Sequence, residues 1–218
     1  MEERTRVVVV TGGRGALGGV VMERFARQGA TVVGIDITGS GEGLTEDGER
    51  AHTWWRRADL TRASEVRAAF ESIEERFGGV DVVVHCAGGF RFTHMDEASD
   101  ADIDFLVDVN LRSSLYVMRQ SLQIMKRGGY GRIVLMSSRS TLKPGAGEGA
   151  YTATKAGLNA LTMAVAEEVK ELDIRVNSIQ PVIIDTAANR EAMPEAPHEK
   201  WVKPSELAEI IFTLTTAV

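Results

Sequence analysis

The sequence predicts a single doubly wound α/β domain, in which helices cover both faces of a parallel sheet. Short runs of β-branched and other apolar residues alternate with amphipathic helical patterns along the 218 residues. This order requires right-handed crossovers between parallel strands. Most strand-like runs are apolar at nearly every position, which indicates strands buried on both faces. We therefore expect one domain over residues 1–218, with a parallel sheet of six or seven strands.

Six segments have the strand pattern. Most are rich in valine and isoleucine and end at glycine or at a polar residue, as buried strands do. The segment 39–49 is instead rich in glycine and acidic residues, and we expect a loop there. The strands are expected at residues 6–10, 31–36, 52–57, 80–86, 131–137 and 174–179.

Amphipathic helical stripes separate these strands. Leu17, Val21 and Phe25 recur every four residues after the first strand, as on the buried face of a helix. Comparable spacings recur between the later strands and after the last one. Helices are expected around residues 17–25, 66–77, 110–125, 158–172 and 205–215.

Composition and charge exclude several classes of protein. A net charge of −6 argues against a nucleic-acid or anionic-membrane surface, because binding to phosphate polyanions needs excess positive charge. The single cysteine, Cys86, excludes an internal disulfide and fits a reducing compartment. The four histidines are dispersed, so no metal site is predicted. No apolar run approaches the ~18 residues of a membrane span, and no signal-peptide pattern precedes the first strand. We expect a cytoplasmic protein.

A glycine-rich loop follows the first strand and opens the first helix. Gly13, Gly15 and Gly18 have the spacing G-x-G-x-x-G. Glycines at these positions let the backbone approach a pyrophosphate, and the helix N-terminus offers free N–H groups to it. An ordinary strand-to-helix turn is the alternative interpretation. The residues predicted to contact a dinucleotide here are Arg14, Gly15, Ala16, Leu17 and Gly18.

Asp36 ends the second strand, 18 residues after Gly18. A carboxylate at this place accepts hydrogen bonds from a ribose diol and repels a 2′-phosphate, so it favours NAD(H) over NADP(H). Arg14 favours the opposite choice, because a basic side chain in the loop contacts phosphate. NADP(H) therefore stays open as a second cofactor. A solvated loop carboxylate is the alternative interpretation of Asp36.

Tyr151 and Lys155 lie one turn apart at the start of a predicted helix. A tyrosine with its ordinary pKa of about 10 is a poor base at neutral pH. An ammonium one turn away lowers that pKa and makes the phenol a usable acid and base. Ser138 ends the fifth strand 13 residues earlier and can hold a carbonyl or alcohol oxygen beside the phenol. The alternatives are a surface pair on a helix and a serine that only terminates a strand.

Taken together, these residues resemble the short-chain dehydrogenase/reductase family, whose members have a Rossmann fold and use a nicotinamide cofactor. The resemblance covers nearly the whole chain, and several motifs in the right order are more specific than any single one. The matching motifs are Thr11-Gly12 through Gly18, Asp36, Asp59-Leu60, Cys86-Ala87-Gly88, Asn110, Ser138, Tyr151-x-x-x-Lys155 and Pro181 through Asp185-Thr186.

The resemblance implies a role for each matching residue. Tyr151 would be the general acid and base, Lys155 would bind the nicotinamide ribose, and Ser138 would position the substrate oxygen. Asn110 would hold a water in a proton relay through Lys155. Asp59 would contact adenine, Ala87 and Gly88 would pass along the adenosine ribose, and Ile183 and Thr186 would meet the nicotinamide carboxamide. The resemblance also implies cofactor contacts for Gly12, Leu60 and Pro181.

The chain departs from the family pattern at several places. Ala16 stands where the family has a glycine, and Val182 stands where a glycine follows the proline. His85 and Cys86 replace two asparagines, which loses an asparagine side chain that commonly ties strands together. The segment 187–203, which in the family forms the substrate lid, is short, and the strand that the family has after the last helix has no counterpart. We therefore expect an open pocket and a sheet edge that is exposed or covered by a partner.

Two local stretches resemble dihydropteridine reductase, a branch of the same family. They are residues 12–18 and 185–196, and Phe90 follows Ala87-Gly88-Gly89 in a similar way. The leading function is an oxidoreductase acting on a small-molecule carbonyl or secondary alcohol. The alternatives are a dihydropteridine- or quinone-reductase-like activity and an NAD(H)-binding sensor without turnover. In this family the helices corresponding to 111–125 and 158–172 form dimer interfaces, which implies a homodimer or homotetramer.

Smaller features have two interpretations each. Phe90, Arg91, Phe92 and His94 follow the fourth strand and form either a stacking wall with a cationic anchor or ordinary loop packing. Cys86 is expected to be buried and inert rather than an oxidation-sensitive thiol.

Overall fold

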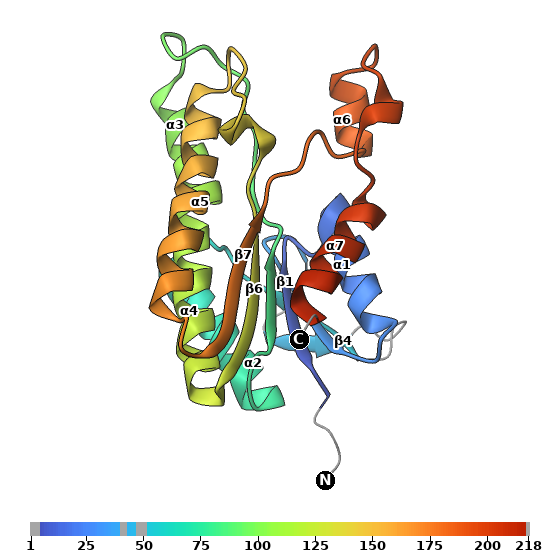
Figure 1. Ribbon diagram of the computed structural model, residues 1–218, viewed down its shortest axis with the longest axis vertical. Helices are drawn as coiled ribbons and strands as arrows, with labels where there is room; N and C mark the ends of the chain where they lie inside the picture. The colour runs from blue at the N-terminus through green and yellow to red at the C-terminus, as the bar shows by residue number, and fades with distance from the viewer. Residues whose placement is uncertain (1–4, 40–42, 47–51, 217–218) are drawn as a thin grey trace.

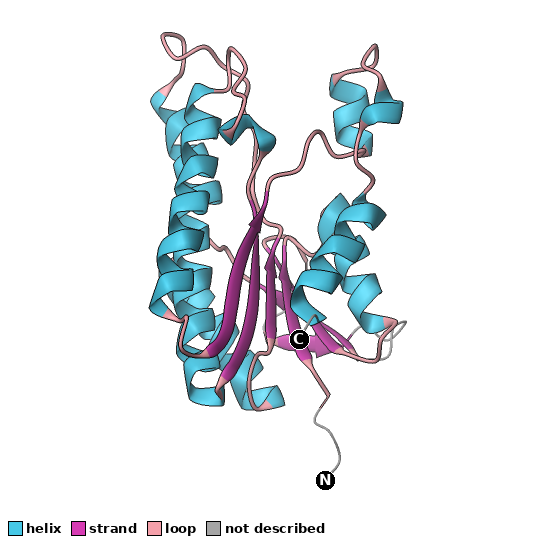
Figure 2. Cartoon of the chain, in the orientation of Figure 1, coloured by secondary structure: helices cyan, strands magenta, loops and turns pink. Residues whose placement is uncertain are grey.

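A seven-stranded sheet forms the centre of the protein in the computed structural model, which describes residues 5–39, 43–46 and 52–216. The strand order is β3-β4-β2-β1-β5-β6-β7. Helices pack on both faces of the sheet (Figures 1 and 2), which confirms the doubly wound α/β domain. The parallel strands are β1 (Val7–Thr11), β2 (Thr31–Asp36), β4 (Thr53–Arg57), β5 (Val82–His85), β6 (Tyr130–Met136) and β7 (Asp173–Ile179).

The seventh strand lies where the sequence predicts a loop. Within residues 39–49, β3 (Leu44–Glu46) pairs antiparallel with β4, with Thr45 opposite Trp55. The sheet of the described residues is therefore mostly parallel, and the prediction of a loop throughout this segment is wrong. Three residues between glycine and acidic positions are too few to show a strand period, so only pairing with β4 reveals the strand. The other loop positions 40–42 and 47–49 lie outside the described residues.

The helices form two layers, one on each face of the sheet. On one side lie α1 (Ala16–Ala26) and α7 (Pro204–Thr216), and on the other lie α2 (Ala63–Phe77), α4 (Ser113–Gly128) and α5 (Gly149–Glu168) (Figure 1). β1 contributes side chains to the cores on both faces of the sheet. Val8 and Val10 belong to the core beneath α1 and α7, whereas Val7 and Val9 belong to the opposite core. This alternation explains why an entirely apolar strand is needed at the centre.

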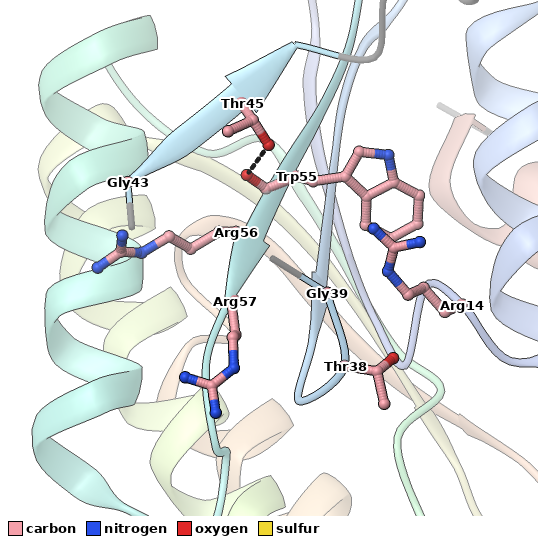
Figure 3. Close-up of a pocket in the computed structure, with 8 residues that line it drawn as sticks. All are labelled: Arg14, Thr38, Gly39, Gly43, Thr45, Trp55, Arg56 and Arg57. Carbon is pink, nitrogen blue, oxygen red and sulfur yellow. Dashed lines mark hydrogen bonds between the residues drawn. The ribbon is translucent and has the colours of Figure 1, made fainter. Parts of the chain in front are cut away.

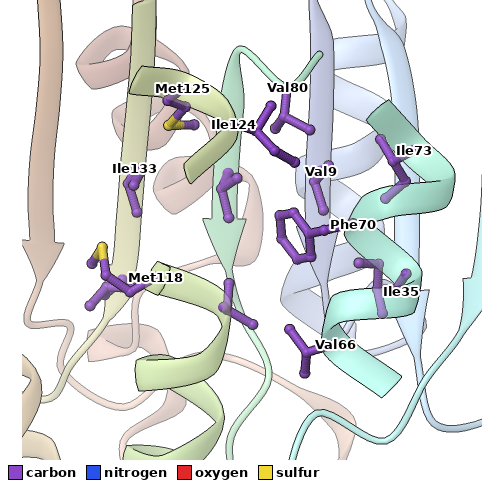
Figure 4. Packing of buried hydrophobic residues seen from close by; sticks show 14 of the residues in the cluster. Val9, Ile35, Val66, Phe70, Ile73, Val80, Met118, Ile124, Met125 and Ile133 are labelled. Atoms are coloured by element: carbon purple, nitrogen blue, oxygen red, sulfur yellow. The ribbon is translucent and has the colours of Figure 1, made fainter. Parts of the chain in front are cut away.

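The larger core lies between the sheet and the layer formed by α2, α4 and α5 (Figure 4). Phe70 and Ile73 of α2 are fully buried against Val9 of β1 and Ile35 of β2. Each such side chain contributes about 1.5–3 kcal/mol by leaving water. The helix α2 ends where Gly78 adopts a left-handed conformation with φ 78°. The core thus fixes the strands whose ends carry the predicted site.

The carboxyl ends of the parallel strands share one edge of the sheet, and the chain bends there into its functional loops (Figure 2). β2 and β5 lie on opposite sides of β1, so the connections after β1 and β5 diverge, and ligands of such sheets usually bind at this point. Shorter elements surround it: α3 (Asp100–Leu106), the π-helical segment η1 (Val107–Arg112), η2 (Arg139–Thr141), α6 (Ala187–Ala192) and η3 (His198–Lys200). Among the helices of the described residues, none is long and apolar enough to cross a membrane.

Candidate active site

The glycine loop makes a turn that side chains would obstruct. A Cβ atom on Gly18 would lie 2.1 Å from the carbonyl oxygen of Gly12, and one on Gly12 would lie 2.9 Å from the backbone nitrogen of Ala87. Gly12 also has a φ of 64°, in the left-handed region. α1 begins at Ala16 after Gly15, and among the described residues no side chain caps it. A tight glycine turn leading to an uncapped helix N-terminus fits a phosphate group.

Asp36 lies at the open end of β2, beside this loop. Its carboxylate accepts hydrogen bonds from the backbone nitrogens of Arg14 (3.1 Å) and Thr38 (3.0 Å) and from the Thr38 hydroxyl (2.8 Å). The Arg14 guanidinium instead stacks on Trp55, 4.3 Å from the ring centroid. Figure 3 shows both residues in a small hollow that Arg57 and Thr38 also line. The carboxylate is therefore held in place next to the glycine loop, while the cation of Arg14 lies against an aromatic face.

The loop after β5 is held by Asn110. Asn110 lies in η1 and is 1% exposed. Its Oδ1 accepts a hydrogen bond from the backbone nitrogen of Gly89 (3.0 Å), and its Nδ2 donates to the Gly89 oxygen (2.9 Å) and to the Thr154 hydroxyl (3.3 Å). Gly88 lies close to Asn110 and Lys155. A Cβ atom on Gly88 would lie 2.9 Å from Asn110 Oδ1 and 3.2 Å from Lys155 Nζ, so only glycine fits there without displacing them. The lack of a side chain at Gly88 therefore lets the backbone pass close to both polar groups.

Tyr151 and Lys155 lie one turn apart on α5, as the sequence predicts, and Ser138 follows β6 beside them. The Lys155 Nζ donates to the Met136 carbonyl (2.8 Å) and lies 5.8 Å from the centroid of the Tyr151 ring. The ring of Phe90 meets the Tyr151 ring edge-on at 4.9 Å. Strand ends, one helix and the loop after β5 therefore bring the predicted catalytic residues together.

Burial dominates the electrostatics of this group. It raises the pKa of Tyr151, a hydrogen bond with Ser138 opposes that rise, and the charge of Glu148 adds to it. Burial lowers the pKa of Lys155 to about 8. The Lys155 ammonium donates to the Met136 carbonyl, and the lowering of the Tyr151 pKa by Lys155 together with a bound cofactor ribose stays a prediction. The hydrogen bond with Ser138 is the contact that favours the phenolate.

The sequence of the chain matches the family described as short chain dehydrogenase over residues 6–197. The chain belongs to the short-chain dehydrogenase family. It is an NAD(P)-dependent oxidoreductase, which agrees with the glycine loop, the acid after β2 and the tyrosine–lysine pair.

Individual relatives agree with this assignment. An uncharacterised oxidoreductase of Mycobacterium bovis is 33% identical over 222 residues, which cover 97% of this chain and 90% of that protein. An acetoacetyl-CoA reductase of Allochromatium vinosum is 29% identical, over 94% of this chain and 89% of its own length. The crystal structure of gox2181 matches with a TM-score of 0.85 at 27% identity, covering 98% of this chain and 89% of that one.

The remaining predicted cofactor residues of this short-chain dehydrogenase lie at the same edge of the sheet, mostly in structural contacts. After β4, the Asp59 carboxylate accepts from the Thr61 nitrogen (2.9 Å) and hydroxyl (2.7 Å). Although burial raises the pKa of Asp59, these bonds and Arg62 lower it overall. Leu60 is buried. The contact of Asp59 with adenine stays a prediction.

The segment after β7 begins close to Ser138. The Pro181 carbonyl accepts from the Arg139 nitrogen (3.0 Å), and Ile183 is 39% exposed. Thr186 caps α6 by accepting from the Asn189 nitrogen (3.2 Å). In this short-chain dehydrogenase the lid segment 187–203 holds only α6 and the single turn η3. Nicotinamide contacts of Pro181, Ile183 and Thr186 stay predictions.

The departures from the family pattern are accommodated locally. Ala16 is exposed at the start of α1, so its methyl group blocks nothing in the turn. Cys86 is half-buried rather than fully buried, and desolvation of its thiol raises the pKa of Cys86 to about 12, as expected of an inert thiol. His85 is buried and bonds to Thr11, so it supplies the tie between strands that the sequence comparison counts as lost. Nothing in the local sequence signals this role.

The predicted aromatic wall is partly present. Phe90 contacts Tyr151, and Phe92 meets the His94 ring edge-on at 5.9 Å. Arg91 does not supply a cationic anchor there, since its guanidinium lies 4.2 Å from the Phe105 ring centroid and 3.8 Å from Asp102. Within the described residues, no group of histidine, cysteine and acidic side chains is placed to hold a metal ion.

Proposed function

We propose that this short-chain dehydrogenase interconverts a carbonyl compound and a secondary alcohol with NAD(H), and that the one domain of residues 1–218 holds both the cofactor and the substrate. The observation that carries the proposal is the convergence of Ser138, Tyr151 and Lys155 beside the bare backbone of Gly88. The bound nicotinamide supplies the hydride in reduction and accepts it in oxidation.

The protein's own residues handle the proton and the oxygen. In reduction, Tyr151 donates its phenolic proton to the carbonyl oxygen as the carbon receives the hydride pair, so a ketone gains one hydride and one proton. Ser138 holds the same oxygen and stabilises the phenolate left on Tyr151. Lys155, charged below a pKa of about 8, binds the ribose and returns the proton through the region that Asn110 lines.

Asp36 supports NAD(H) as the cofactor. Its carboxylate is fixed by Arg14 and Thr38 where a ribose diol would bind, and a 2′-phosphate would be placed against a fixed negative charge. Arg14 does not offset this, because it stacks on Trp55.

Titration of the purified protein with NADH and with NADPH, followed by nicotinamide fluorescence, tests this choice. NADH is expected to bind at least about tenfold more tightly, equivalent to about 1.4 kcal/mol. Asp36→Asn should narrow the difference, whereas Glu46→Gln, which changes an exposed acid on β3, should leave it unchanged. Tighter NADPH binding by the wild type would refute the proposed cofactor.

The loops beside Tyr151 support a planar, apolar carbonyl compound as the substrate. Phe90 is 48% exposed next to Tyr151. Phe92 lies over the backbone of Gly147, where a Cβ would be 2.6 Å from the ring, and Thr93 donates to the Gly147 oxygen (3.0 Å). The loops after β5 and before α5 are therefore joined into one wall with exposed aromatic faces, and aromatic faces favour stacking with a flat substrate.

Turnover of acetophenone, acetoacetyl-CoA and a quinonoid dihydropterin with NADH tests the substrate class. We expect acetophenone to have the highest kcat/KM of the three. Phe90→Ala should lower that value by about threefold to tenfold, the size of an aromatic contact, with less effect on acetoacetyl-CoA. Ile210→Ala, an exposed apolar change on α7, is the matched control. A preference for the thioester, whose reduction names one of the relatives, would contradict the proposed substrate class.

A pteridine or quinone reductase is the second candidate, since the flat wall at Phe90 also suits a fused ring. In that reaction Ser138 and Asn110 would matter little. Ser138→Ala separates the two candidates. If this variant lost most of its turnover of acetophenone but kept its turnover of the dihydropterin, the dihydropterin would be reduced by the second mechanism, without Ser138.

We also propose a homo-oligomer, dimer or tetramer, assembled through α4 and α5. Leu115 of α4 is 45% exposed and Met163 of α5 is 69% exposed, which leaves apolar surface on the outer layer. Sedimentation of the wild type and of a Leu115→Glu, Met163→Glu variant tests this. The wild type should sediment as the assembly and the variant as smaller species; a monomeric wild type would refute it.

A further inference from the structure

A buried histidine lies between the end of β1 and the start of α4, next to the segment that carries Asn110. His85, the last residue of β5, is 1% exposed. Its Nδ1 is 2.7 Å from the hydroxyl oxygen of Thr11 at the end of β1, and its Nε2 is 3.3 Å from the hydroxyl oxygen of Ser113 at the start of α4. Both ring nitrogens are thus bonded, as a buried imidazole requires.

The neighbouring bonds fix which atom donates at each step. The Ser113 hydroxyl donates to the Val109 carbonyl (2.7 Å), so its oxygen accepts from His85 and Nε2 carries the proton. Nδ1 then accepts from the Thr11 hydroxyl, whose oxygen in turn accepts from the Ala87 backbone nitrogen (3.3 Å). The hydrogen bonds run in one direction from Ala87 through the imidazole to Val109.

We propose that His85 is a positioning residue. It couples the loop after β5, at Ala87, to the π-helical segment η1, and so holds Asn110 against Gly88 and Lys155. This inference rests on the proposed function. One end of the network holds the backbone of Ala87, and the other holds Val109, the residue before Asn110. Asn110 then links η1 back to the loop after β5, because its amide accepts a hydrogen bond from the Gly89 nitrogen and donates one to the Gly89 oxygen.

The imidazole does this as a neutral group. Burial and, to a smaller extent, the positive charge of Lys155 lower the pKa of His85 to about 3. A neutral ring accepts at one nitrogen and donates at the other, whereas an imidazolium would donate at both and would lose its bond from Thr11. The π-helical turn matters because it departs from α-helical geometry where Asn110 must face Gly89, and such turns are frequent at functional sites.

Two substitutions separate the two ends of the network. Asparagine reaches about as far as Nδ1 of histidine, and glutamine reaches about as far as Nε2. His85→Asn keeps the bond to Thr11 and loses the one to Ser113; we expect kcat to fall on the order of tenfold, with NADH binding within about twofold of the wild type. His85→Gln keeps the bond to Ser113; we expect NADH binding to weaken on the order of tenfold, with kcat nearly kept.

Ser113→Ala and Ser121→Ala form a matched pair that leaves β5 untouched. Both serines lie buried on α4, and each donates to the carbonyl four residues earlier, Ser121 to Val117 at 2.7 Å. Only Ser113 contacts His85. Ser113→Ala should therefore reproduce the kcat loss of His85→Asn, while Ser121→Ala should change thermal stability alone. Equal kcat values for the two alanine variants would overturn the proposal.

The ring nitrogens of His85 in the wild-type protein provide a test that needs no turnover. The ¹⁵N shifts of the His85 ring should show the neutral tautomer with the proton on Nε2 at pH 5 to 8. His85→Gln identifies the signals by their loss. A proton on Nδ1 would overturn the network. So would His85 variants that change kcat and NADH affinity in parallel. Absence of turnover with every carbonyl would refute the proposed function, and the tautomer and the NADH titration would still decide this inference.

Discussion

The two sides of the candidate active site differ in the chemical groups that form them, backbone on one side and side chains on the other. On the β1–β2 side, the glycine loop uses bare backbone, and Gly18 leaves only 2.1 Å between the position of a Cβ and the Gly12 oxygen. On the β5–β7 side, side chains define the site: Tyr151 and Lys155 come from α5, Asn110 from η1 and Ser138 from the turn after β6. The first side is shaped to bind, and the second is shaped to move a proton. Substitutions on the two sides should therefore have separable effects.

The largest effect is expected on the side-chain side. Tyr151→Phe removes the proton donor and should reduce kcat by about 10²- to 10⁴-fold, because its neighbour Ser138 has no proton of comparable acidity to give. NADH affinity should stay within about twofold, as measured by nicotinamide fluorescence. Tyr116→Phe on α4 is the control. A Tyr151→Phe variant that turns over like the wild type would remove Tyr151 from the chemistry.

The next effect is expected on the backbone side. Gly18→Ala places a methyl group against the Gly12 oxygen, so the turn must open, and NADH affinity should fall on the order of tenfold. Gly19→Ala is an unusually close control, because a Cβ on Gly19 would meet the Gly13 oxygen at an ordinary 3.6 Å. Equal NADH affinities for the two alanine variants would show that the turn does not bind the cofactor.

The pH profile should report Lys155. Burial lowers its pKa to about 8, so the ammonium is present below that pH and is lost above it, and kcat/KM should decline as the pH rises through about 8. Stability should change in the opposite sense. The unfolded chain binds the Lys155 proton up to its ordinary pKa of 10.5, so this residue makes folding more favourable as the pH rises from about 8 to 10.5.

Lys155→Arg sharpens that measurement, since a guanidinium stays charged throughout this range. The decline in kcat/KM near pH 8 should disappear in the variant, whatever its absolute rate. A decline at the same pH in both proteins would assign it to another group.

The smallest effect is expected where the chain departs from the family pattern. Ala16→Gly restores the family glycine, yet the Ala16 side chain is exposed at the helix start and obstructs nothing. NADH affinity should change by less than about twofold, with a small loss of stability because glycine is the poorer helix former. A large gain in affinity would show that the methyl group of Ala16 does restrict the phosphate site.

The same division explains what the sequence could predict. The glycine loop, the acid at position 36 and the tyrosine–lysine pair are local patterns, and so were visible before the fold was known. The strand at Leu44–Glu46 depends on pairing with β4, and the role of His85 depends on Ser113, 28 residues away. The π-helical turn at Asn110 leaves no mark on the apolar period. The orientation of Lys155 toward the Met136 carbonyl is likewise set by packing rather than by spacing.

We propose that the backbone side binds the cofactor and that the side chains of the other side carry out the reaction. Single-turnover measurements with acetophenone, in which NADH affinity and the rate at saturating NADH are obtained together, test it most directly. Gly18→Ala should weaken NADH binding and leave the saturated rate near that of the wild type, and Tyr151→Phe should do the reverse. If each variant instead changed both quantities to the same degree, the division of labour between the two sides would be contradicted.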